Sequence, residues 1–187
     1  DQSKAYDSVQ SYTVQDSLRR LSLPEGFVSY VMSSMTDRKA YVRTGHGDTD
    51  TFGVETSVRQ GDPLAPILFI FVNDVLHEGL ERNPLFENAC DGYRFHNDTH
   101  VYDRTTSAGY ADDTIVISES EDGIHRLHEW IRCFFSAHRW KINVKKTVYT
   151  TTASLERLDA NLRLLSVDGA SMIAPHTPYH TFRYLGL

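Results

Sequence analysis

The most constraining feature of the sequence is a nine-residue stretch in which two adjacent aspartates interrupt an apolar, strand-forming segment. The stretch reads Gly109-Tyr110-Ala111-Asp112-Asp113-Thr114-Ile115-Val116-Ile117. Strand-forming residues on both sides of the acids predict a hairpin over 108–110 and 114–118, with the Asp-Asp pair at its bend. An isolated pair of this kind usually marks a solvated turn. Here a tight bend would hold both carboxylates at a fixed place, and hard oxygen ligands suit Mg²⁺.

The pattern around this hairpin predicts an α+β chain with hairpins and no regular βαβ alternation. Apolar residues at helical spacing predict helices over 8–21, 27–35, 63–82 and 122–138. Strands are predicted over 39–44 and 51–58, with a turn at 45–48, and strand-like pieces at 141–144, 148–152, 164–167 and 182–187. The polar segment 83–103 is predicted to be a loop.

Composition limits the class of protein. A length of 187 residues predicts one domain over 1–187. Two cysteines provide no disulfide framework, so we expect an intracellular protein. We see no secretory leader, and the longest unbroken apolar run, 67–72, is far too short to span a membrane, so no membrane partner is expected.

Charge is unevenly distributed along the chain. The net charge is −6, which by itself argues against a nucleic-acid partner. The balance of Lys and Arg against Asp and Glu is −11 over 1–125 and +5 over 126–187. A basic C-terminal third is compatible with a surface that faces a polyanion, but charge alone favours an arbitrary asymmetry on a solvated surface.

A third acid would have to converge on the hairpin for metal chemistry. Asp1, at the start of Asp1-Gln2-Ser3-Lys4-Ala5-Tyr6-Asp7, is the candidate. If Asp1 and Asp112 both bind metal, they could hold two Mg²⁺ ions about 4 Å apart, the arrangement that serves in-line phosphoryl displacement. Spacing along the chain does not establish this convergence.

Five segments of the chain occur in the order of polymerase motifs A to E. They are Asp1…Ala5-Tyr6-Asp7, Arg59-Gln60-Gly61-Asp62-Pro63-Leu64-Ala65-Pro66, Tyr110-Ala111-Asp112-Asp113, Lys141-Ile142-Asn143…Lys146-Thr147 and Phe182-Arg183-Tyr184-Leu185-Gly186. The YADD tetrapeptide is a weak signal alone and becomes a strong one with RQGDPLAP upstream of it at a helix start. From its first residue to its last, the chain resembles the reverse transcriptase domain of non-LTR (LINE-type) retrotransposons.

The resemblance implies a role for each matching residue. Asp1, Asp112 and Asp113 would be the catalytic metal ligands, for two Mg²⁺ ions or, alternatively, Mn²⁺. Lys146 would protonate the departing pyrophosphate, with Lys141 and Lys145 as rivals for this role. Further residues would contact the substrates: Tyr6 as a steric filter against ribonucleotides, Arg59, Gln60 and Gly61 in the nucleotide pocket, and Tyr184, Leu185 and Gly186 on the primer strand. A half-buried core position for Tyr6 and a buried strand at 184–186 are the competing interpretations.

The family fold implied is a right-hand polymerase palm, an antiparallel sheet backed by helices, with part of the fingers. The hairpin over 38–58 would belong to the fingers, and 141–187 would carry motifs D and E. The N-terminal fingers and the thumb would lie outside this chain, which we therefore expect to be a fragment of a longer polyprotein. The implied partners are an RNA template, a DNA primer, dNTPs and the rest of that polyprotein, which includes an endonuclease in some members, in the nucleus.

The chain departs from the family pattern at two positions. Ser57 and Arg139 stand where LINE-type sequences typically carry glycine. A positive φ at either position would add strain. These departures leave a second hypothesis open, a catalytically inactive remnant that at most binds or supports other chains. An RNA-dependent RNA polymerase is a third, against which Tyr6 and the Gln60-Gly61 pair argue.

Overall fold

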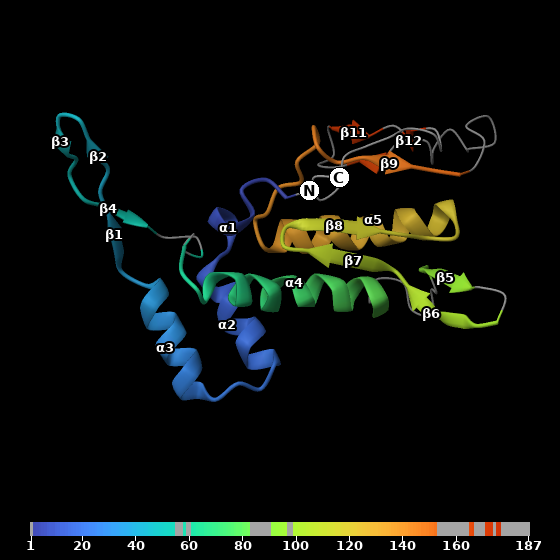
Figure 1. Cartoon of the computed structure of the whole chain (residues 1–187), viewed down its shortest axis with the longest axis horizontal. Helices are drawn as coiled ribbons and strands as arrows, with labels where there is room; N and C mark the ends of the chain where they lie inside the picture. The colour runs from blue at the N-terminus through green and yellow to red at the C-terminus, as the bar shows by residue number, and fades with distance from the viewer. Residues whose placement is uncertain are drawn as a thin grey trace. The chain divides into compact units, whose positions relative to one another are not determined.

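The structure, a computed structural model, describes residues 2–54, 58, 61–82, 91–96, 99–152, 165–166, 171–173 and 175–176. The helices are α1 (Ala5–Ser8), α2 (Ser11–Arg20), α3 (Glu25–Met35), α4 (Ala65–Arg82) and α5 (Glu121–Ala137). The strands are β1 (Arg38–Ala40), β2 (Arg43–Thr44), β3 (Gly47–Asp48), β4 (Phe52–Val54), β5 (Tyr93–His96), β6 (Val101–Thr105), β7 (Ser107–Tyr110), β8 (Asp113–Val116), β9 (Tyr149–Thr150), β10 (Leu165–Ser166), β11 (Met172–Ile173) and β12 (Pro175–His176). Figure 1 shows them in chain order.

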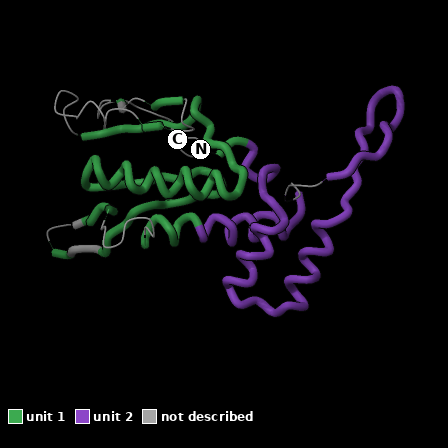
Figure 2. The backbone as a smooth tube through the Cα atoms, turned by 180° about the vertical axis from the view of Figure 1, so that it is seen from behind, with its two compact units in different colours: residues 1–3, 76–187 green, residues 4–75 purple. Residues whose placement is uncertain are grey.

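Contacts divide the chain into two compact units, where the sequence predicts one domain. Unit 1 comprises Asp1–Ser3 and Leu76–Leu187, and unit 2 comprises Lys4–Val75, as coloured in Figure 2. The boundary falls inside α4, which is one continuous helix. Of the helices that the structure describes, α4 is the longest, and none, α4 included, has the length and hydropathy needed to cross a bilayer.

Unit 2 begins with helices that bury one apolar face each. The predicted helix over 8–21 is interrupted, because Val9 and Gln10 have extended backbone between α1 and α2. α2 and α3 pack as a helical hairpin. Among the described residues of unit 2, the largest fully buried side chains are Val9, Val14, Leu18, Val28, Val31, Phe69 and Val72.

The predicted hairpin is confirmed over 38–54, while 55–57, within the predicted strand over 51–58, lie outside the described residues. β1 pairs with β4 and β2 pairs with β3, both antiparallel, and Gly45 and His46 form the turn between β2 and β3. Thr49 bridges the two pairs, because its backbone N–H donates to Val42 O at 3.0 Å and its hydroxyl accepts from Val42 N at 3.0 Å. The β2–β3 end of the hairpin is exposed along both strands.

α4 begins as the sequence predicts, at a proline-containing turn. The Asp62 carboxylate accepts a hydrogen bond from Leu64 N at 2.9 Å, and Asp62 O accepts from Ala65 N at 3.0 Å. These bonds satisfy backbone donors that a helix start leaves free, and Pro63 and Pro66 have no N–H to satisfy. The helix therefore starts close to Gly61, whose φ is +90°.

In unit 1, α5 runs alongside the β7–β8 hairpin (Figure 1). The helix predicted over 122–138 is confirmed, and two of the apolar residues at helical spacing that predict it, Leu127 and Phe134, are buried. Ser120 caps the helix, accepting from Gly123 N at 3.0 Å, and two acids follow in the first turn, where the helix dipole favours them. At the other end Trp140 packs edge-on against Phe135, with ring centroids 5.6 Å apart.

Two sequence predictions in unit 1 are wrong. The segment 83–103 is predicted to be a loop, but β5 lies within it and pairs antiparallel with β6. Tertiary contacts stabilise that pair: Arg94 N donates to Glu119 Oε1 at 2.9 Å, and Arg104 Nη1 donates to Gly92 O at 2.8 Å. The predicted strand over 141–144 is reduced to one bridge between Ile142 and Gln2, because the chain turns back at Asn143.

The described strands pair as six two-stranded sheets, five antiparallel and one, β9 with β12, parallel. β11 and β12 were not predicted, while the predicted strand over 182–187 lies outside the described residues. Tyr149, Leu165 and Ile173 form a small core, against which Ile124 of α5 and Ile142 pack. The structure is thus a mixed α and β fold in which short strands are supported by α5.

Candidate active site

The Asp112-Asp113 hairpin forms as predicted, with a two-residue turn. Tyr110 pairs with Asp113 across the turn, so Ala111 and Asp112 are its central residues. Ala111 has φ +52°, which a type II′ turn requires at its first central position and which glycine adopts more readily than alanine. This strained backbone lies at the position where we expect metal ligands, as is common at functional sites.

Both aspartates face a cavity of about 750 Å³ inside unit 1. Asp112 and Asp113 are half-buried, and Lys146, which is exposed, lines the same cavity. The rest of the lining comes from α5, β8, β9 and their neighbours and is mainly apolar, with Ile115, Ile131 and Phe135 among it. Two carboxylates and one ammonium thus share a concave site with apolar walls, the setting in which fixed charges act most strongly.

Lysines 141, 145 and 146 remained alternatives at the level of sequence. Of the three, only Lys146 belongs to the cavity lining. The turn that begins at Asn143 fixes its backbone, because Asn143 O accepts from Lys146 N at 3.1 Å and from Thr147 Oγ1 at 2.8 Å. This geometry favours Lys146 over its two neighbours as the residue that could deliver a proton at the site.

Gln2 also lines this cavity. It is buried, and its bridge to Ile142 joins the start of the chain to the segment that carries the lysines. Ser3 N strengthens the junction by donating to Lys141 O at 2.9 Å. The residue that directly follows Asp1 in the sequence therefore lies at the same cavity as Asp112 and Asp113.

Tyr6 belongs to unit 2, where its ring stacks on Phe69 of α4. The ring centroids are 4.7 Å apart and the planes are 17° from parallel. Tyr6 O accepts a hydrogen bond from Val58 N at 3.0 Å, so the segment that leads to the RQGDP motif contacts α1. The tyrosine is half-buried, which leaves part of its ring available for a second contact.

Gly61 is exposed, and its φ of +90° is one that side-chain-bearing residues rarely adopt. Space around it is open, since a Cβ built there meets no atom within 4 Å. The backbone conformation, and not crowding, therefore requires glycine here. Six other predicted site residues lie outside the described residues: Asp1, Arg59, Gln60, Tyr184, Leu185 and Gly186.

The described residues supply part of the ligand set that a metal ion would need at this site. Among the described residues no group of three or more His, Cys, Asp or Glu side chains is arranged to hold a metal. Asp112 and Asp113 supply hard oxygen donors at one turn, as Mg²⁺ requires, and the predicted third ligand, Asp1, is outside the described residues. The two carboxylates would hold the ion together with Asp1.

Polar residues that the sequence did not identify contact the strand that leads to this site. His77 of α4 contacts Ser107 of β7, with 2.8 Å between Nδ1 and Oγ. A histidine four turns into an apolar helix gives no local signal of its partner. The strand pattern does give one indication: Ser107 and Gly109 are two residues apart on β7 and so lie on the same face of it.

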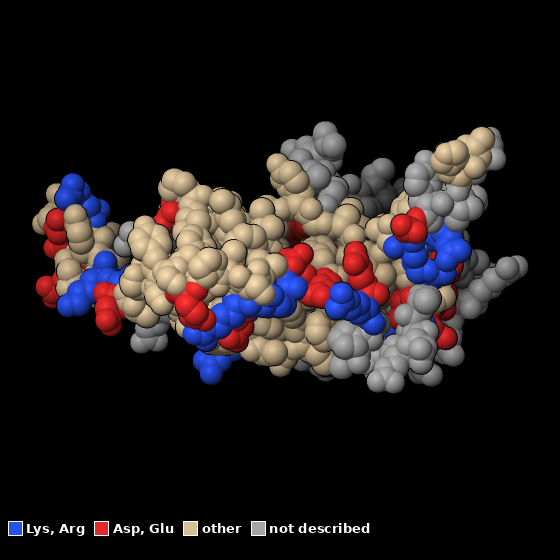
Figure 3. Space-filling view, turned by 90° about the horizontal axis from the view of Figure 1, so that it is seen from below, with Lys and Arg blue, Asp and Glu red and all other residues tan. Residues whose placement is uncertain are grey.

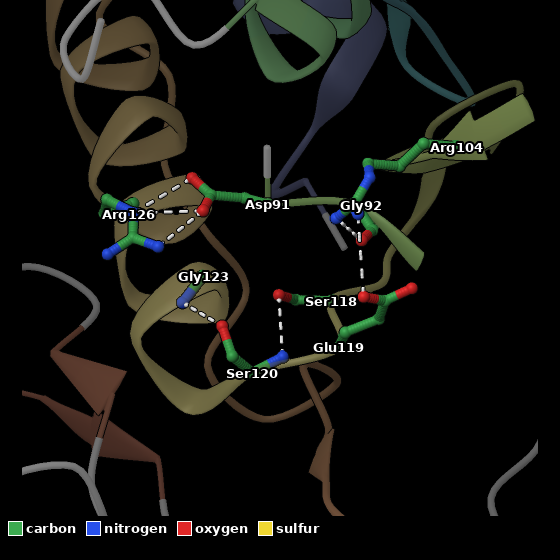
Figure 4. Close-up of polar contacts among 8 residues, drawn as sticks. All are labelled: Asp91, Gly92, Arg104, Ser118, Glu119, Ser120, Gly123 and Arg126. Atoms are coloured by element: carbon green, nitrogen blue, oxygen red, sulfur yellow. Dashed lines mark hydrogen bonds and ion pairs between the residues drawn. The ribbon is translucent and has the colours of Figure 1, made fainter. Parts of the chain in front are cut away.

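A second missed cluster connects the start of α5 to the β5–β6 hairpin (Figure 4). Asp91 forms an ion pair with Arg126 of α5. Arg104 donates a hydrogen bond to Gly92 O and lies 3.6 Å from the Glu119 carboxylate. Ser118 Oγ accepts a hydrogen bond from Ser120 N at 3.3 Å. Gly123 lies close to this cluster, since a Cβ built there would be 2.2 Å from Ser118 Oγ. The cluster fixes the helix that forms one wall of the cavity.

Charged side chains of both signs lie next to one another on the face shown in Figure 3. Several basic residues are paired with acids in the structure. The ion pairs include Arg20–Asp74, Arg82–Glu78, Arg104–Glu119, Arg126–Asp91 and Arg132–Glu129. Of these pairs, only Arg126–Asp91 joins a basic residue of 126–187 to an acid outside that segment. Net charge alone does not identify a nucleic-acid surface.

Known proteins share sequence similarity with this chain over its whole length. The family described as reverse transcriptase (RNA-dependent DNA polymerase) matches residues 1–187. A Pol polyprotein from the type-1 retrotransposable element R2 of Popillia japonica is 28% identical over all of this chain, which covers 25% of that protein. The Pol polyprotein from the type-2 element R2DM of Drosophila melanogaster is 32% identical over 78% of this chain, and the match covers 13% of that protein. The chain thus spans a quarter or less of these two relatives.

Proposed function

The chain belongs to the reverse transcriptase family, and from this we propose that it is the catalytic portion of an RNA-directed DNA polymerase that adds dNTPs to a primer 3′-OH. The observation that carries the proposal is the shared cavity of Asp112, Asp113, Lys146 and Gln2 in unit 1. This cavity is lined by two acids that would bind metal, an ammonium group that would donate the proton, and the residue next to Asp1. Nucleotidyl transfer needs that combination.

The cavity supports a division of roles among the chain's own residues. Asp112 and Asp113, with Asp1, would hold Mg²⁺, with Mn²⁺ as the alternative ion. Bound there, two such ions neutralise the phosphates and stabilise both the attacking and the leaving oxygen. Lys146 would give its proton to the leaving pyrophosphate oxygen, and a positioned general acid of this kind contributes roughly 10²–10⁴-fold.

Residues of unit 2 would select the nucleotide. Tyr6 would oppose a 2′-hydroxyl on the incoming sugar, and its stack on Phe69 would keep the ring from turning away. Arg59, Gln60 and Gly61 would line the nucleotide pocket, and the open space around Gly61 leaves its backbone free to approach a substrate. Tyr184, Leu185 and Gly186 would contact the primer strand.

In terms of polymerase architecture, we assign unit 1 and α1 to the palm, and the β1–β4 hairpin to the fingers. The short length of the match to the two R2 relatives supports a longer parent polyprotein that supplies the remaining fingers, the thumb and, in some members, an endonuclease. Its template would be RNA, its primer DNA, and its place of action the nucleus.

Primer extension on poly(rA)/oligo(dT) tests this function. The parent polyprotein and the chain alone are assayed with dTTP and Mg²⁺, as wild type and as Asp112→Asn, Asp113→Asn. Asp103→Asn is the matched control, because Asp103 is an exposed acid of β6 outside the cavity lining. We expect extension by the wild type and the control, and none by the double variant. Activity that survives the double change would refute the catalytic role, and a polyprotein with no activity would support the inactive remnant.

A further inference from the structure

His77 lies against the strand that leads into the Asp112 turn. Its Nδ1 is 2.8 Å from Ser107 Oγ on β7, and both residues belong to unit 1. Ser107 is the first residue of β7, and the turn begins after the last, Tyr110. The imidazole is half-buried, so this hydrogen bond is partly shielded from water.

The same imidazole also contacts Gly109. A Cβ built on Gly109 would lie 2.5 Å from His77 Nε2 and 3.0 Å from Cε1. Real Cβ atoms do not come this close, so the ring occupies the space that any other residue at 109 would need. Ser107 and Gly109 lie on one face of β7, and His77 therefore holds the strand at two successive positions on that face.

α4 is itself held at this point. Trp130 Nε1 of α5 donates to Leu76 O at 3.1 Å, directly beside His77 in the sequence. The indole also covers Gly79, where a Cβ would lie 2.1 Å from Trp130 Cε2. His77 is therefore carried by a helix segment that α5 also contacts, at Leu76 and Gly79.

We propose that His77 is a positioning residue that sets where the β7–β8 turn presents the Asp112 carboxylate. The argument rests on the proposed function, because the turn matters for catalysis only if Asp112 holds the reaction's metal. The backbone of the turn is strained at Ala111, and the turn has only two residues, Ala111 and Asp112. A displacement of β7 is therefore passed on to Asp112. Misplacement of about 1 Å at a reacting centre can cost roughly 10²-fold in rate, so a small shift of β7 has a measurable effect.

The test combines substitutions at 77, 107 and 109 in the parent polyprotein. His77→Ala removes both contacts, whereas His77→Asn keeps a donor and an acceptor near the Nδ1 position. Ser107→Ala removes only the hydrogen bond. Gly109→Ala forces its Cβ into the ring, and the pair Gly109→Ala, His77→Ala removes the clash. Gly53→Ala is the matched control, since Gly53 is also a strand glycine but nothing lies within 4 Å of its Cβ position.

The readouts are kcat, the Mg²⁺ concentration that gives half-maximal activity, the Kd for primer–template and the thermal unfolding midpoint. We expect His77→Ala to lower kcat about 10-fold, to raise the Mg²⁺ concentration that gives half-maximal activity, and to leave the Kd for primer–template unchanged. His77→Asn should restore most of the kcat and most of the Mg²⁺ response. Gly109→Ala alone should be more impaired than Gly109→Ala, His77→Ala. Gly53→Ala should match the wild type.

Two results would overturn the proposal. One is a loss of kcat in His77→Ala that follows thermal stability alone and is not restored by asparagine. The other is a Gly109→Ala defect that is the same whether residue 77 is His or Ala. If the wild type extends no primer, the proposed function fails instead, and broadening of the Ala111 and Asp112 amide NMR signals by Mn²⁺ then decides the positioning claim. Equal broadening in the wild type and in His77→Ala would contradict it.

Discussion

The Asp91 carboxylate accepts three hydrogen bonds from the Arg126 guanidinium. Arg126 Nε lies 3.0 Å and 3.1 Å from the two carboxylate oxygens, and Nη2 lies 2.6 Å from Oδ1. The Asp91 side chain is 2% exposed, and the hydrogen bond to it raises the pKa of Arg126 above the ordinary arginine value. The pair joins α5 to the chain just before β5.

Arg126→Ala should destabilise the fold by about 3 kcal/mol, because it leaves a buried carboxylate without its charge partner. We choose the low end of the usual range because the Arg126 side chain is 32% exposed and partly screened. Arg132→Ala on the same helix is the control, since its partly exposed i,i+3 pair with Glu129 is worth only about 0.5 kcal/mol. Urea unfolding measures the free energy of unfolding of both variants. An equal loss of stability in the two would contradict the assigned role of the Asp91–Arg126 pair.

Arg139→Gly should stabilise the fold by about 1 kcal/mol. Arg139 has φ +58° at the end of α5, where Trp140 N donates to Phe135 O at 2.8 Å and Arg139 N to Ser136 O at 3.2 Å. These two bonds define a Schellman motif, which favours glycine at the position of Arg139. Arg139→Ala, which keeps a Cβ, should bring no such gain. An equal gain in both variants would mean that charge, and not backbone strain, is the cause.

Tyr6→Ala should increase rNTP use relative to dNTP and also lower stability. The selectivity change follows from losing the ring that opposes a 2′-hydroxyl, and the lost stack on Phe69 costs about 1 kcal/mol beyond the buried area. Tyr6→Phe keeps the ring and should keep dNTP selectivity. Competitive incorporation of dTTP and UTP gives the ratio. Unchanged selectivity in Tyr6→Ala would remove Tyr6 from this role.

Acidification should weaken the packing of α5 on β10 through His128. Burial lowers the pKa of His128 below 6.5, His125 and Arg132 lower it further, and the hydrogen bond to Ser166 O opposes them. The neutral ring that donates from Nε2 to Ser166 O at 2.7 Å is therefore the folded form. The unfolded chain takes up the proton first, so the stability present above pH 6.5 is lost as pH falls through the lowered pKa.

His128→Gln retains a donor to Ser166 O and does not titrate. The free energy of unfolding of the wild type should therefore fall more steeply between pH 7 and pH 5 than that of His128→Gln, as measured by urea unfolding at each pH. Parallel pH dependence in the two proteins would show that His128 is not responsible.

Local sequence chemistry predicted the elements whose signals are local. The Asp112 turn, α4 after Pro63 and the apolar face of α5 all follow from turn chemistry, capping and periodicity, and all three are confirmed. The positive φ suspected where glycine is usual is also present, at Arg139, while Ser57 lies outside the described residues.

What the sequence could not predict depends on partners distant along the chain. β5 is stabilised by Glu119 and Arg104, and no pattern within 83–103 signals those contacts. The interaction of His77 with Gly109 has the same origin, since it joins residues 32 positions apart on a helix and a strand. Gln2 at the cavity is a third example, because spacing alone left open whether the start of the chain reaches the hairpin.

The central claim is that Asp1 and Asp112 bind the same metal ions, and Mn²⁺ affinity measured by electron paramagnetic resonance tests it most directly. Titrations compare the wild type, Asp1→Asn, Asp112→Asn, the Asp1→Asn, Asp112→Asn pair and the control Asp103→Asn. We predict that each single site variant loses most of the affinity, that the pair loses little more than either alone, and that the control binds as the wild type does. Unchanged affinity in Asp1→Asn, or fully additive losses in the pair, would contradict a shared site.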